Sequence, residues 1–299
     1  MSEHQEIYFL IYGAKGWIGG QVVSILDKRN IKYHLSNLRV DDTLKLEEEI
    51  LSIGPSHIIS TIGRTHGNYQ GVEYPTIDYL EQPGKAYENV RDNLYSPLTL
   101  AILSHRYNIH YTYLGTGCIF DYDDSHPKGN SETGYNEDDV PNFIGSSYSI
   151  VKGFTDRLMH LYPDVLNIRI RMPIIDGKNR RDFIAKIMKY KKICNMPNSM
   201  SVLSTLIPVM VDMALKKRTG TINLTNPGLI SHNQILEMYR DIVDPNFTWQ
   251  NFSIEEQDQI LDSKRSNNCL DTTHLESLYP EIPDIKIAVN EVIKNMDNK

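Results

Sequence analysis

The sequence predicts an α/β protein built on a doubly wound parallel sheet, with a smaller and mostly helical second domain. Short apolar runs alternate with helical patterns through the first half of the chain, which is typical of βαβ units. A run of glycines follows the first apolar run, where such sheets turn into their first helix. After Pro173 the chain changes to short helical patterns separated by loops that contain Asn and Pro.

The elements expected in the first half follow one another regularly. Residues 7–12 form a continuous apolar run, as expected for a strand buried on both faces. Further strands are expected at residues 32–35, 57–60, 111–114 and 165–170. Helices are expected around residues 18–26, 44–53, 86–106 and 148–161, with Pro97 bending the third of them. A long polar loop covers residues 121–145, and it either closes over a ligand or is ordinary surface.

The second half is expected to be mostly helical. Helical patterns occupy residues 183–190, 205–216, 232–242, 254–261 and 286–296, and only residues 221–224 still have the pattern of a buried strand. We therefore expect a first domain at residues 1–170, rejoined by about residues 205–226, and a second domain at residues 171–299.

Composition excludes several classes of function. The 299 residues include 31 basic and 38 acidic ones, a net charge of −7, and no basic cluster that would suit nucleic acid or anionic lipid. The longest apolar run, residues 202–215, is interrupted by polar residues and is too short to cross a bilayer. The cysteines show neither paired nor metal-type spacing, and residues 1–6 show no signal-peptide core. We expect a cytoplasmic protein without a metal.

A glycine-rich turn joins the first strand to the first helix. Its glycines have the spacing G-x-x-G-x-x-G, which provides a tight turn, close backbone approach and a helix N-terminus that favours a pyrophosphate. The alternative is that the glycines only make the turn. We expect Rossmann-type dinucleotide binding, with contacts from Gly13, Lys15, Gly16, Trp17, Ile18, Gly19 and Thr61.

The residues after the second strand indicate which dinucleotide binds. Ser36-Asn37-Leu38-Arg39 lacks the carboxylate that would accept a hydrogen bond from the ribose 2′-hydroxyl of NAD, and the first acidic residue is Asp41. Lys15 and Arg39 could instead pair with a 2′-phosphate, unless both are simply solvated surface cations. We expect NADPH, with NADH as the alternative.

A tyrosine and a lysine stand at helical spacing later in the chain. Tyr148-Ser149-Ile150-Val151-Lys152 has the pattern Y-x-x-x-K, which places both ionisable side chains on one helix face. The lysine would stabilise the phenolate and so make the tyrosine a usable proton donor. It could also hold the nicotinamide ribose. The alternative is a surface aromatic–cation pair.

The order of these features resembles the extended short-chain dehydrogenase/reductase family. The glycine turn comes first, then Asn93 in a helix, then Thr116 after a strand, and then Tyr148 with Lys152. The resemblance implies that Thr116, Tyr148 and Lys152 form the catalytic set, with Thr116 hydrogen-bonded to the substrate carbonyl. It also implies that Asn93 supports the lysine through water.

Several stretches resemble one subfamily, the bifunctional UDP-4-keto-6-deoxyglucose 3,5-epimerase/4-reductases. The chain is also similar to the dTDP-4-dehydrorhamnose reductases and, around Cys118, to the GDP-fucose synthases. The stretches are Gly16-Trp17-Ile18-Gly19-Gly20, Thr116-Gly117-Cys118-Ile119-Phe120, Arg171-Met172-Pro173-Ile174, Pro197-Asn198-Ser199-Met200, Thr225-Asn226-Pro227-Gly228 with Ser231-His232-Asn233, and Arg265-Ser266-Asn267-Asn268.

Epimerisation next to a ketone needs two acid/base groups. Cys118 lies two residues after Thr116 and should therefore lie near the carbonyl, where a thiol can take or give a proton. The alternative is a buried structural cysteine. By the resemblance, Lys186 is the second acid/base; otherwise it is a solvated lysine on an amphipathic helix. The resemblance also places Asn198, Asn226 and Arg265 at the substrate, with Arg265 facing the diphosphate.

The resulting hypothesis is a two-stage reaction on UDP-4-keto-6-deoxy-D-glucose or its dTDP analogue. Both C3 and C5 are inverted, and NADPH then reduces C4. The upstream 4,6-dehydratase is expected on a separate chain, because there is no second glycine turn. The resemblance further implies a homodimer paired through helices that flank the sheet. The rivals are a 4-reductase without epimerase activity and a non-catalytic, dinucleotide-binding regulatory subunit.

Overall fold

The chain forms a six-stranded sheet from strands that lie between Tyr8 and Asn223. The computed structural model describes residues 6–297. The strand order is β10-β7-β6-β3-β1-β2, and β1 pairs in parallel with both β2 and β3, as β3 does with β6. The predicted doubly wound parallel sheet is confirmed. The strands are β1 (Tyr8–Tyr12), β2 (Lys32–Leu35), β3 (His57–Ser60), β6 (His110–Thr116), β7 (Val165–Ile170) and β10 (Gly220–Asn223).

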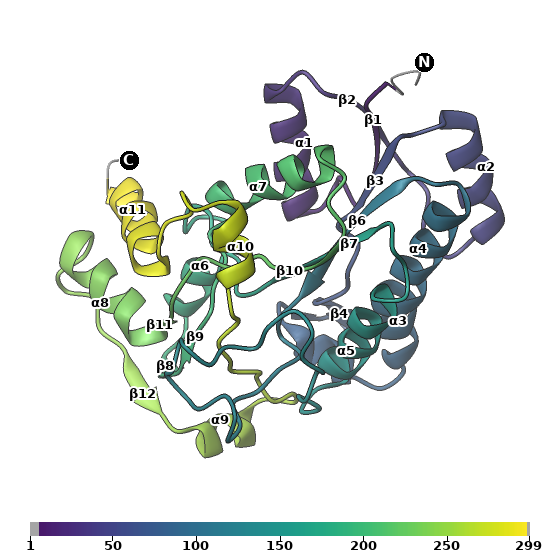
Figure 1. Cartoon of the computed structure of the whole chain (residues 1–299). Coiled ribbons are helices and arrows are strands. Elements are labelled where there is room, and N and C mark those ends of the chain that lie inside the picture. Colours follow the sequence, from purple (N-terminus) through teal and green to yellow (C-terminus); the bar gives the residue numbers. More distant parts are fainter. Residues whose placement is uncertain (1–5, 298–299) are drawn as a thin grey trace. The chain divides into compact units, whose positions relative to one another are not determined.

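Helices cover both faces of this sheet (Figure 1). On one face lie α1 (Trp17–Lys28) and α7 (Leu203–Leu215), which meet where the Arg29 guanidinium donates to the Pro208 carbonyl. On the other lie α2 (Thr43–Ile53), α4 (Ser96–Arg106) and α5 (Ser147–Met159).

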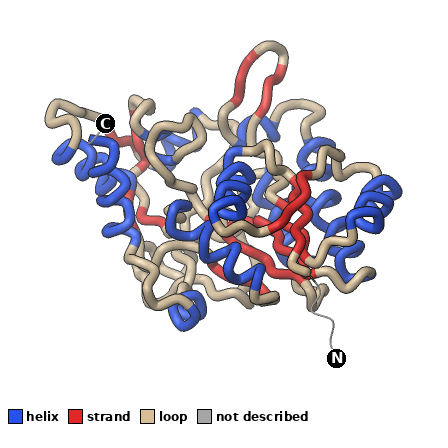
Figure 2. The backbone as a smooth tube through the Cα atoms, turned by 90° about the horizontal axis from the view of Figure 1, so that it is seen from above, coloured by secondary structure: helices blue, strands red, loops and turns tan. Residues whose placement is uncertain are grey.

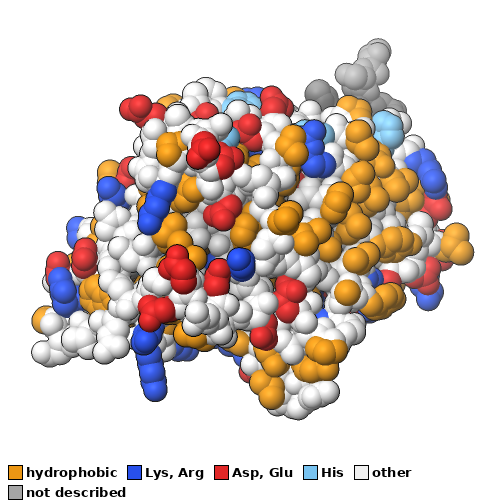
Figure 3. Space-filling view, turned by 90° about the horizontal axis from the view of Figure 1, so that it is seen from below, with side chains coloured by type: hydrophobic (Ala, Val, Ile, Leu, Met, Phe, Trp, Pro, Cys, Tyr) orange, Lys and Arg blue, Asp and Glu red, His pale blue; other side chains and the backbone are white. Residues whose placement is uncertain are grey.

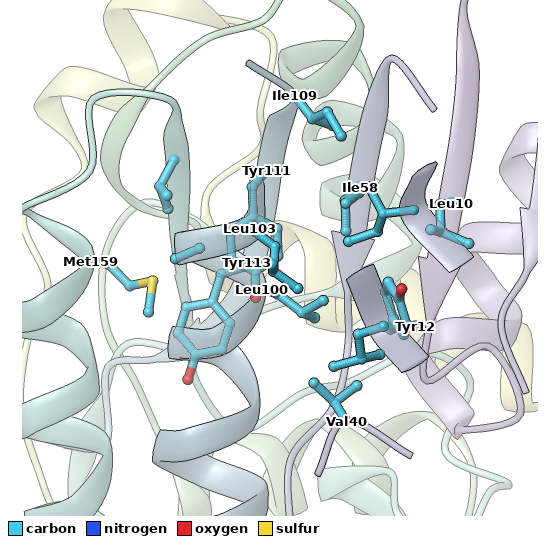
Figure 4. Close-up of a cluster of buried hydrophobic side chains, with 14 residues drawn as sticks. Leu10, Tyr12, Val40, Ile58, Leu100, Leu103, Ile109, Tyr111, Tyr113 and Met159 are labelled. Carbon is cyan, nitrogen blue, oxygen red and sulfur yellow. The ribbon is translucent and has the colours of Figure 1, made fainter. Parts of the chain in front are cut away.

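An apolar core lies beneath α2, α4 and α5, because successive side chains of each strand alternate between the two faces of the sheet. Side chains two residues apart on β1 and β6 point to the same face, where they meet apolar side chains of the helices (Figure 4). Each large apolar side chain buried there contributes about 1.5–3 kcal/mol. Fully buried members include Leu10, Tyr12, Ile58, Tyr111 and Tyr113 from the strands, with Leu46, Leu100, Leu103 and Met159 from the helices.

The expected helix at residues 86–106 is divided into three parts. These are α3 (Ala86–Val90), a π-helical turn η2 (Arg91–Tyr95) and α4. The three parts follow one another without a break, and Pro97 lies in the first turn of α4, directly after the π-helical turn. It has no N–H for the Asn93 carbonyl four residues earlier, and the Thr155 hydroxyl of α5 donates to that carbonyl instead, at 2.6 Å.

A hairpin that the sequence does not predict follows β3. It pairs β4 (Gly67–Tyr69) with β5 (Val72–Tyr74), and a 3₁₀ helix η1 (Ile77–Glu81) comes next. The hairpin projects at the top of Figure 2. Gln70 and Gly71 at its tip both have positive φ angles, 50° and 83°, as a two-residue turn of this hand requires. Strands of three residues are too short to show an alternating pattern.

The chain forms two compact units. The first comprises the chain up to Thr116, Ser147–Ile168 and Ile207–Ile222, and the second comprises Gly117–Ser146, Arg169–Leu206 and the chain from Asn223 onward. The expected first domain, residues 1–170, differs by including residues 117–146. Backbone hydrogen bonds explain the difference, because Tyr122 donates to Asn267 and Tyr135 donates to Cys269 within the second unit.

The second unit has an apolar core of its own, formed mainly by isoleucine, valine and methionine side chains. Its helices are α6 (Phe183–Ile187), α8 (His232–Ile242), α9 (Ile254–Ile260), α10 (Thr273–Leu278) and α11 (Ile285–Asp297). The expectation of a single strand after Pro173 is wrong, because β8 (Lys192–Cys194) pairs with β12 (Gln250–Phe252) and β9 (Pro197–Asn198) pairs with β11 (Ile230–Ser231). Among the described residues, no helix is long and apolar enough to cross a membrane.

Two histidines are buried in the first unit at the start of neighbouring strands. His57 and His110 are register partners on β3 and β6, with ring centroids 5.6 Å apart. Both are nearly inaccessible, at 1% and 5% exposure. Burial lowers the pKa of His57 to about 3, and it lowers the pKa of His110 as well. Both imidazoles are therefore neutral in the folded protein at neutral pH.

We expect the free energy of unfolding to fall as the pH drops below about 6.5, because the unfolded chain then binds protons that the buried histidines do not. Each histidine contributes a slope of at most about 1.4 kcal/mol per pH unit. Urea unfolding at pH 7 and pH 5 measures the effect. The variant His57→Leu should reduce the slope, whereas His34→Leu, at an exposed position of β2, should keep it. Equal slopes in all three proteins would contradict this account.

Candidate functional site

The Tyr148–Lys152 pair lies in the first turns of α5. The helix start is fixed because the Ser147 amide donates to Glu81 Oε1 at 2.8 Å and the Ser147 hydroxyl donates to the Leu80 carbonyl at 3.3 Å. Tyr148 and Lys152 are 9% and 4% exposed. The pair is therefore not the surface aromatic–cation pair that the sequence left as an alternative.

A second tyrosine, missed by the sequence analysis, contacts the lysine. Lys152 Nζ donates to Tyr113 Oη at 2.5 Å and lies 4.7 Å from the centre of the Tyr113 ring. Burial raises the pKa of Tyr113 well above its ordinary value, and Tyr111 and Tyr148 raise it further, so this phenol stays neutral. Tyr113 lies on β6 three residues before Thr116, the buried last residue of the strand. The first unit therefore contains Thr116, Tyr148 and Lys152, and the lysine is bonded to a buried phenol.

Asn93 has a different set of partners from the one expected. Its Nδ2 donates to the Arg64 carbonyl and to Asn89 Oδ1, and its Oδ1 accepts from the Arg64 amide, all within 2.9 Å. The side chain is fully buried in η2. Asn93 therefore fixes the segment that follows β3.

The glycine turn is closely packed against itself. Gly13 has a φ of 82°, and its carbonyl accepts from the Gly16 amide at 2.9 Å. A Cβ atom on Gly19 would lie 2.2 Å from that carbonyl oxygen, so only glycine fits. Thr61 Oγ1 also donates to the Gly13 carbonyl, at 3.1 Å. The predicted residues Gly13, Gly16, Gly19 and Thr61 are thus brought together.

The first turn of α1 is suited to an anion. Gly16 caps this helix and no side chain caps it, so a ligand can accept from the first amide groups. Trp17 and Ile18 are half-buried in that turn, and Lys15 is exposed beside it. Arg39 is 62% exposed and pairs with Asp41 and Asp92 at 3.4 and 3.8 Å. Such exposed pairs contribute at most about 1 kcal/mol, so the guanidinium can turn to another anion.

Cys118 belongs to the second unit and is half-buried. It lies in the segment Gly117–Phe120, directly after β6. Ile119 and Phe120 of this segment are fully buried in a small apolar cluster with Tyr135 and Leu270. The thiol is therefore presented by a short stretch of chain whose other side chains are anchored.

Lys186 lies in α6 near two other cations. The Asp182 carboxylate caps this helix by accepting from the Ile184 and Ala185 amides at 2.8 and 3.3 Å. Burial lowers the pKa of Lys186, and the positive charges of Arg181 and Arg265 lower it further. Lys186 is therefore not the solvated lysine of the alternative interpretation, and it lies within electrostatic range of Arg265. Such a lysine exchanges protons more readily than a solvated one.

Substrate contact by Asn198 and Asn226 stays a prediction, and the structure shows the contacts of both side chains within the protein. Both are 0% exposed, and their side-chain amides are hydrogen-bonded to other protein atoms. Asn198 Oδ1 accepts from Arg171 Nη2 at 2.6 Å and from the Asn268 amide at 3.0 Å. Asn226 Oδ1 accepts from the Val202 amide at 2.8 Å, and its Nδ2 donates to a backbone carbonyl. In the structure both residues connect segments of the second unit.

The loop at residues 121–145 is anchored at several points. Tyr135 stacks on Phe120 with ring centroids 4.4 Å apart, and His126 stacks on Tyr135 at 3.7 Å. Asn142 Nδ2 donates to Tyr135 Oη at 2.8 Å, and the Asp271 amide donates to the Tyr135 carbonyl at 2.8 Å. These contacts within the second unit make the loop part of its framework.

The chain was compared with known proteins, and no protein-family model matches it. Individual relatives, however, are similar over nearly its whole length. The protein L780 of Acanthamoeba polyphaga mimivirus is 55% identical over 96% of this chain and 98% of its own length. The crystal structure of the L780 UDP-rhamnose synthase has a TM-score of 0.93 and covers 98% of this chain and 100% of its own. A bifunctional dTDP-4-dehydrorhamnose 3,5-epimerase/reductase of Arabidopsis thaliana is 42% identical over 100% of this chain and 96% of its own.

The chain belongs to the bifunctional 4-dehydrorhamnose 3,5-epimerase/reductase family. The predicted resemblance to this subfamily is confirmed. A dTDP-4-dehydrorhamnose reductase of Bacillus anthracis, solved in complex with NADP, shares the fold at 16% identity, with a TM-score of 0.75 over 96% of this chain and 99% of its own.

Proposed function

We propose that the chain converts UDP-4-keto-6-deoxy-D-glucose to UDP-L-rhamnose by inverting C3 and C5 and then reducing C4 with NADPH. One observation carries the proposal: Thr116 ends β6 in the unit that contains Tyr148 and Lys152, and Cys118 follows two residues later. The hydroxyl that would bind the carbonyl and the thiol that would move protons are thus separated by one residue. The relative at 42% identity supports a bifunctional enzyme, and the L780 UDP-rhamnose synthase supports UDP over dTDP.

Epimerisation depends on the C4 ketone. A hydrogen bond from Thr116 to the ketone oxygen would make the hydrogens on C3 and C5 more acidic and stabilise the enediolate. One of Cys118 and Lys186 removes the proton, and the other delivers a proton to the opposite face. After one inversion by a thiolate and an ammonium, the thiol is protonated and the amine is neutral. The second inversion then uses them in opposite roles or follows proton exchange with water.

Reduction uses the residues of the first unit. When bound, the dinucleotide supplies the hydride for C4. Tyr148 would give its phenolic proton to the C4 oxygen, and the ammonium of Lys152, one helical turn away, would stabilise the phenolate that remains. The neutral phenol of Tyr113 holds Lys152 Nζ in place before the reaction. Arg265, whose positive charge lowers the pKa of Lys186, would face the diphosphate of the substrate.

Two substitutions should separate the two stages. In deuterated water with NADPH, Cys118→Ala should lose deuterium incorporation at C3 and C5 by at least about 100-fold, because a general acid/base contributes that much. It should still reduce UDP-4-keto-L-rhamnose. Tyr148→Phe should show the reverse, with exchange kept and reduction lost. NMR of the product sugar and NADPH absorbance measure both activities.

The same experiment decides between the rival functions. Lys186→Met should behave like Cys118→Ala, because the methionine side chain cannot exchange a proton.

If the wild type reduces UDP-4-keto-L-rhamnose but incorporates no deuterium, the chain is a 4-reductase without epimerase activity. If it oxidises no NADPH with either keto sugar, the regulatory-subunit alternative is favoured.

The glycine turn fits the dinucleotide, and a matched pair of variants tests it. Gly19→Ala would place a methyl group 2.2 Å from the Gly13 carbonyl, so the turn must open and NADPH binding should weaken by at least about tenfold. Gly20→Ala has its nearest neighbour at 4.0 Å and should bind normally while stabilising α1 by up to about 1 kcal/mol. Fluorescence titration with NADPH measures the affinity. Equal weakening in both variants would contradict this role for Gly19.

We also propose a homodimer paired through the helices that flank the sheet. Hydrophobic side chains gather on one face of the molecule, toward the right of Figure 3. In the first unit, the helices α3, η2 and α4 pack against α5. Their exposed apolar side chains are Tyr87, Val90, Tyr95, Ile102, Ile150 and Phe154, and Leu161 follows just after the end of α5. A second copy of the same helices would cover this apolar surface.

Phe154→Asp should produce a monomer, because it would place a charge within the proposed apolar interface. Phe154 is 64% exposed on α5. Ile287→Asp is the control, since Ile287 is 56% exposed but lies on α11 in the second unit. Light scattering after size exclusion measures the molar mass of each variant. A wild-type monomer, or a Phe154→Asp dimer, would contradict the proposal.

A further inference from the structure

Two backbone carbonyls, one on either side of Cys118, are held by buried side chains, and one of these side chains holds both. The Gly117 carbonyl accepts from Arg171 Nη1 at 3.0 Å and from Asn268 Nδ2 at 3.0 Å. The Phe120 carbonyl accepts from the same Asn268 Nδ2 at 2.9 Å and from the Ser266 hydroxyl at 2.6 Å. The side-chain amide of Asn268 therefore links the two ends of the segment that bears the Cys118 thiol.

Arg171 and Asn268 are themselves fixed. Arg171 is 1% exposed and Asn268 is 0% exposed. The Arg171 guanidinium makes four further hydrogen bonds, to the carbonyls of Ser199 and Ser266, the Ser266 hydroxyl and Asn198 Oδ1, at 2.6–3.3 Å. A planar guanidinium with this many acceptors has one orientation. The two residues thus form a rigid support for the Gly117 and Phe120 carbonyls.

Gly117 lies directly on this support. A Cβ atom there would lie 2.6 Å from Leu270 Cδ1 and 3.0 Å from Arg171 Cγ, so a side chain would lift the segment away. The Gly117 amide also donates to the Ile170 carbonyl at 3.0 Å. The position of Cys118 is therefore set by packing and hydrogen bonding on both of its sides.

We propose that Arg171 and Asn268 are positioning residues for Cys118, which hold the thiol where it exchanges protons with the substrate. The proposal rests on the proposed role of Cys118 in epimerisation. Thr116 has a separate support, because it is the last residue of β6 in the first unit. Loosening the Cys118 segment should therefore impair proton exchange more than reduction.

The second unit contains a matched control. Asn223 is also 0% exposed, and its Nδ2 also donates to two carbonyls, those of Tyr135 and Asp271, both at 2.9 Å. It accepts from the buried Arg169 guanidinium at 3.4 Å. None of these partners belongs to the Gly117–Phe120 segment. Asn223→Ala therefore removes comparable hydrogen bonds and leaves every hydrogen bond to the Gly117–Phe120 segment in place. The Tyr135 and Arg169 side chains contact this segment only by packing on the Phe120 ring.

The experiment compares Asn268→Ala with Asn223→Ala in the full chain. The first readout is the rate of deuterium incorporation at C3 and C5, set against the rate of reduction of UDP-4-keto-L-rhamnose. Asn268→Ala should lose at least about tenfold in exchange and less than about threefold in reduction, a difference that general destabilisation would not produce. Asn223→Ala should change both rates by the same factor.

The second readout does not depend on catalysis. Iodoacetamide alkylation, followed at each cysteine by mass spectrometry, should become several-fold faster at Cys118 in Asn268→Ala, because the released segment exposes the half-buried thiol. Cys194, which is 8% exposed in the same unit, serves as the internal control. Asn223→Ala should leave the Cys118 rate unchanged.

The outcomes separate the positioning role from the function it rests on. Parallel loss of exchange and reduction in Asn268→Ala, or an unchanged Cys118 alkylation rate, would overturn the positioning role. Absence of deuterium exchange in the wild type would overturn the epimerase proposal, and alkylation would still decide whether the segment is held. Should Asn268→Ala not fold, Ser266→Ala removes one of the bonds to Phe120 and should show the same selective loss, smaller in size.

Discussion

The Arg171 guanidinium is a positive charge buried away from water, and its hydrogen-bond donors need acceptors within the second unit. Burying a charge costs many kcal/mol unless its donors are hydrogen-bonded. Its five hydrogen bonds all go to uncharged oxygens, contributed by Gly117, Asn198, Ser199 and Ser266. These residues come from three distant stretches of chain. The charge therefore fixes how those stretches meet, and one of them carries Cys118.

The two units divide the proposed chemistry between them. The first provides a rigid sheet, and the end of β6 places Thr116 while α5 places Tyr148 and Lys152. The second holds Cys118, and its buried Lys186 has a lowered pKa.

Sequence patterns predicted the residues whose chemistry depends on local spacing. Tyr148 and Lys152 lie on one helix face, and the glycines of the first turn lie after a strand, so each pattern is contained in a few residues. The sheet was predicted for the same reason, because each βαβ unit repeats one pattern.

Contacts between distant segments could not be predicted in this way. The sequence predicts substrate binding by Asn198, and it does not show that the side-chain oxygen accepts from Arg171 and Asn268, which lie 27 and 70 residues away in sequence. Tyr113 looked like an ordinary buried strand residue, and only the structure shows that it accepts a hydrogen bond from Lys152. The stretches that carry the resemblance to the family include Arg171 and Asn268, and in the structure these two side chains support the chain around Cys118.

The most direct test of the account is the reaction of the wild-type chain with UDP-4-keto-6-deoxy-D-glucose and NADPH in deuterated water. The account predicts UDP-L-rhamnose as the product, with deuterium at both C3 and C5 and one NADPH oxidised per sugar. A product of the same configuration as the substrate at C3 and C5, reduced at C4 and free of deuterium, would contradict it.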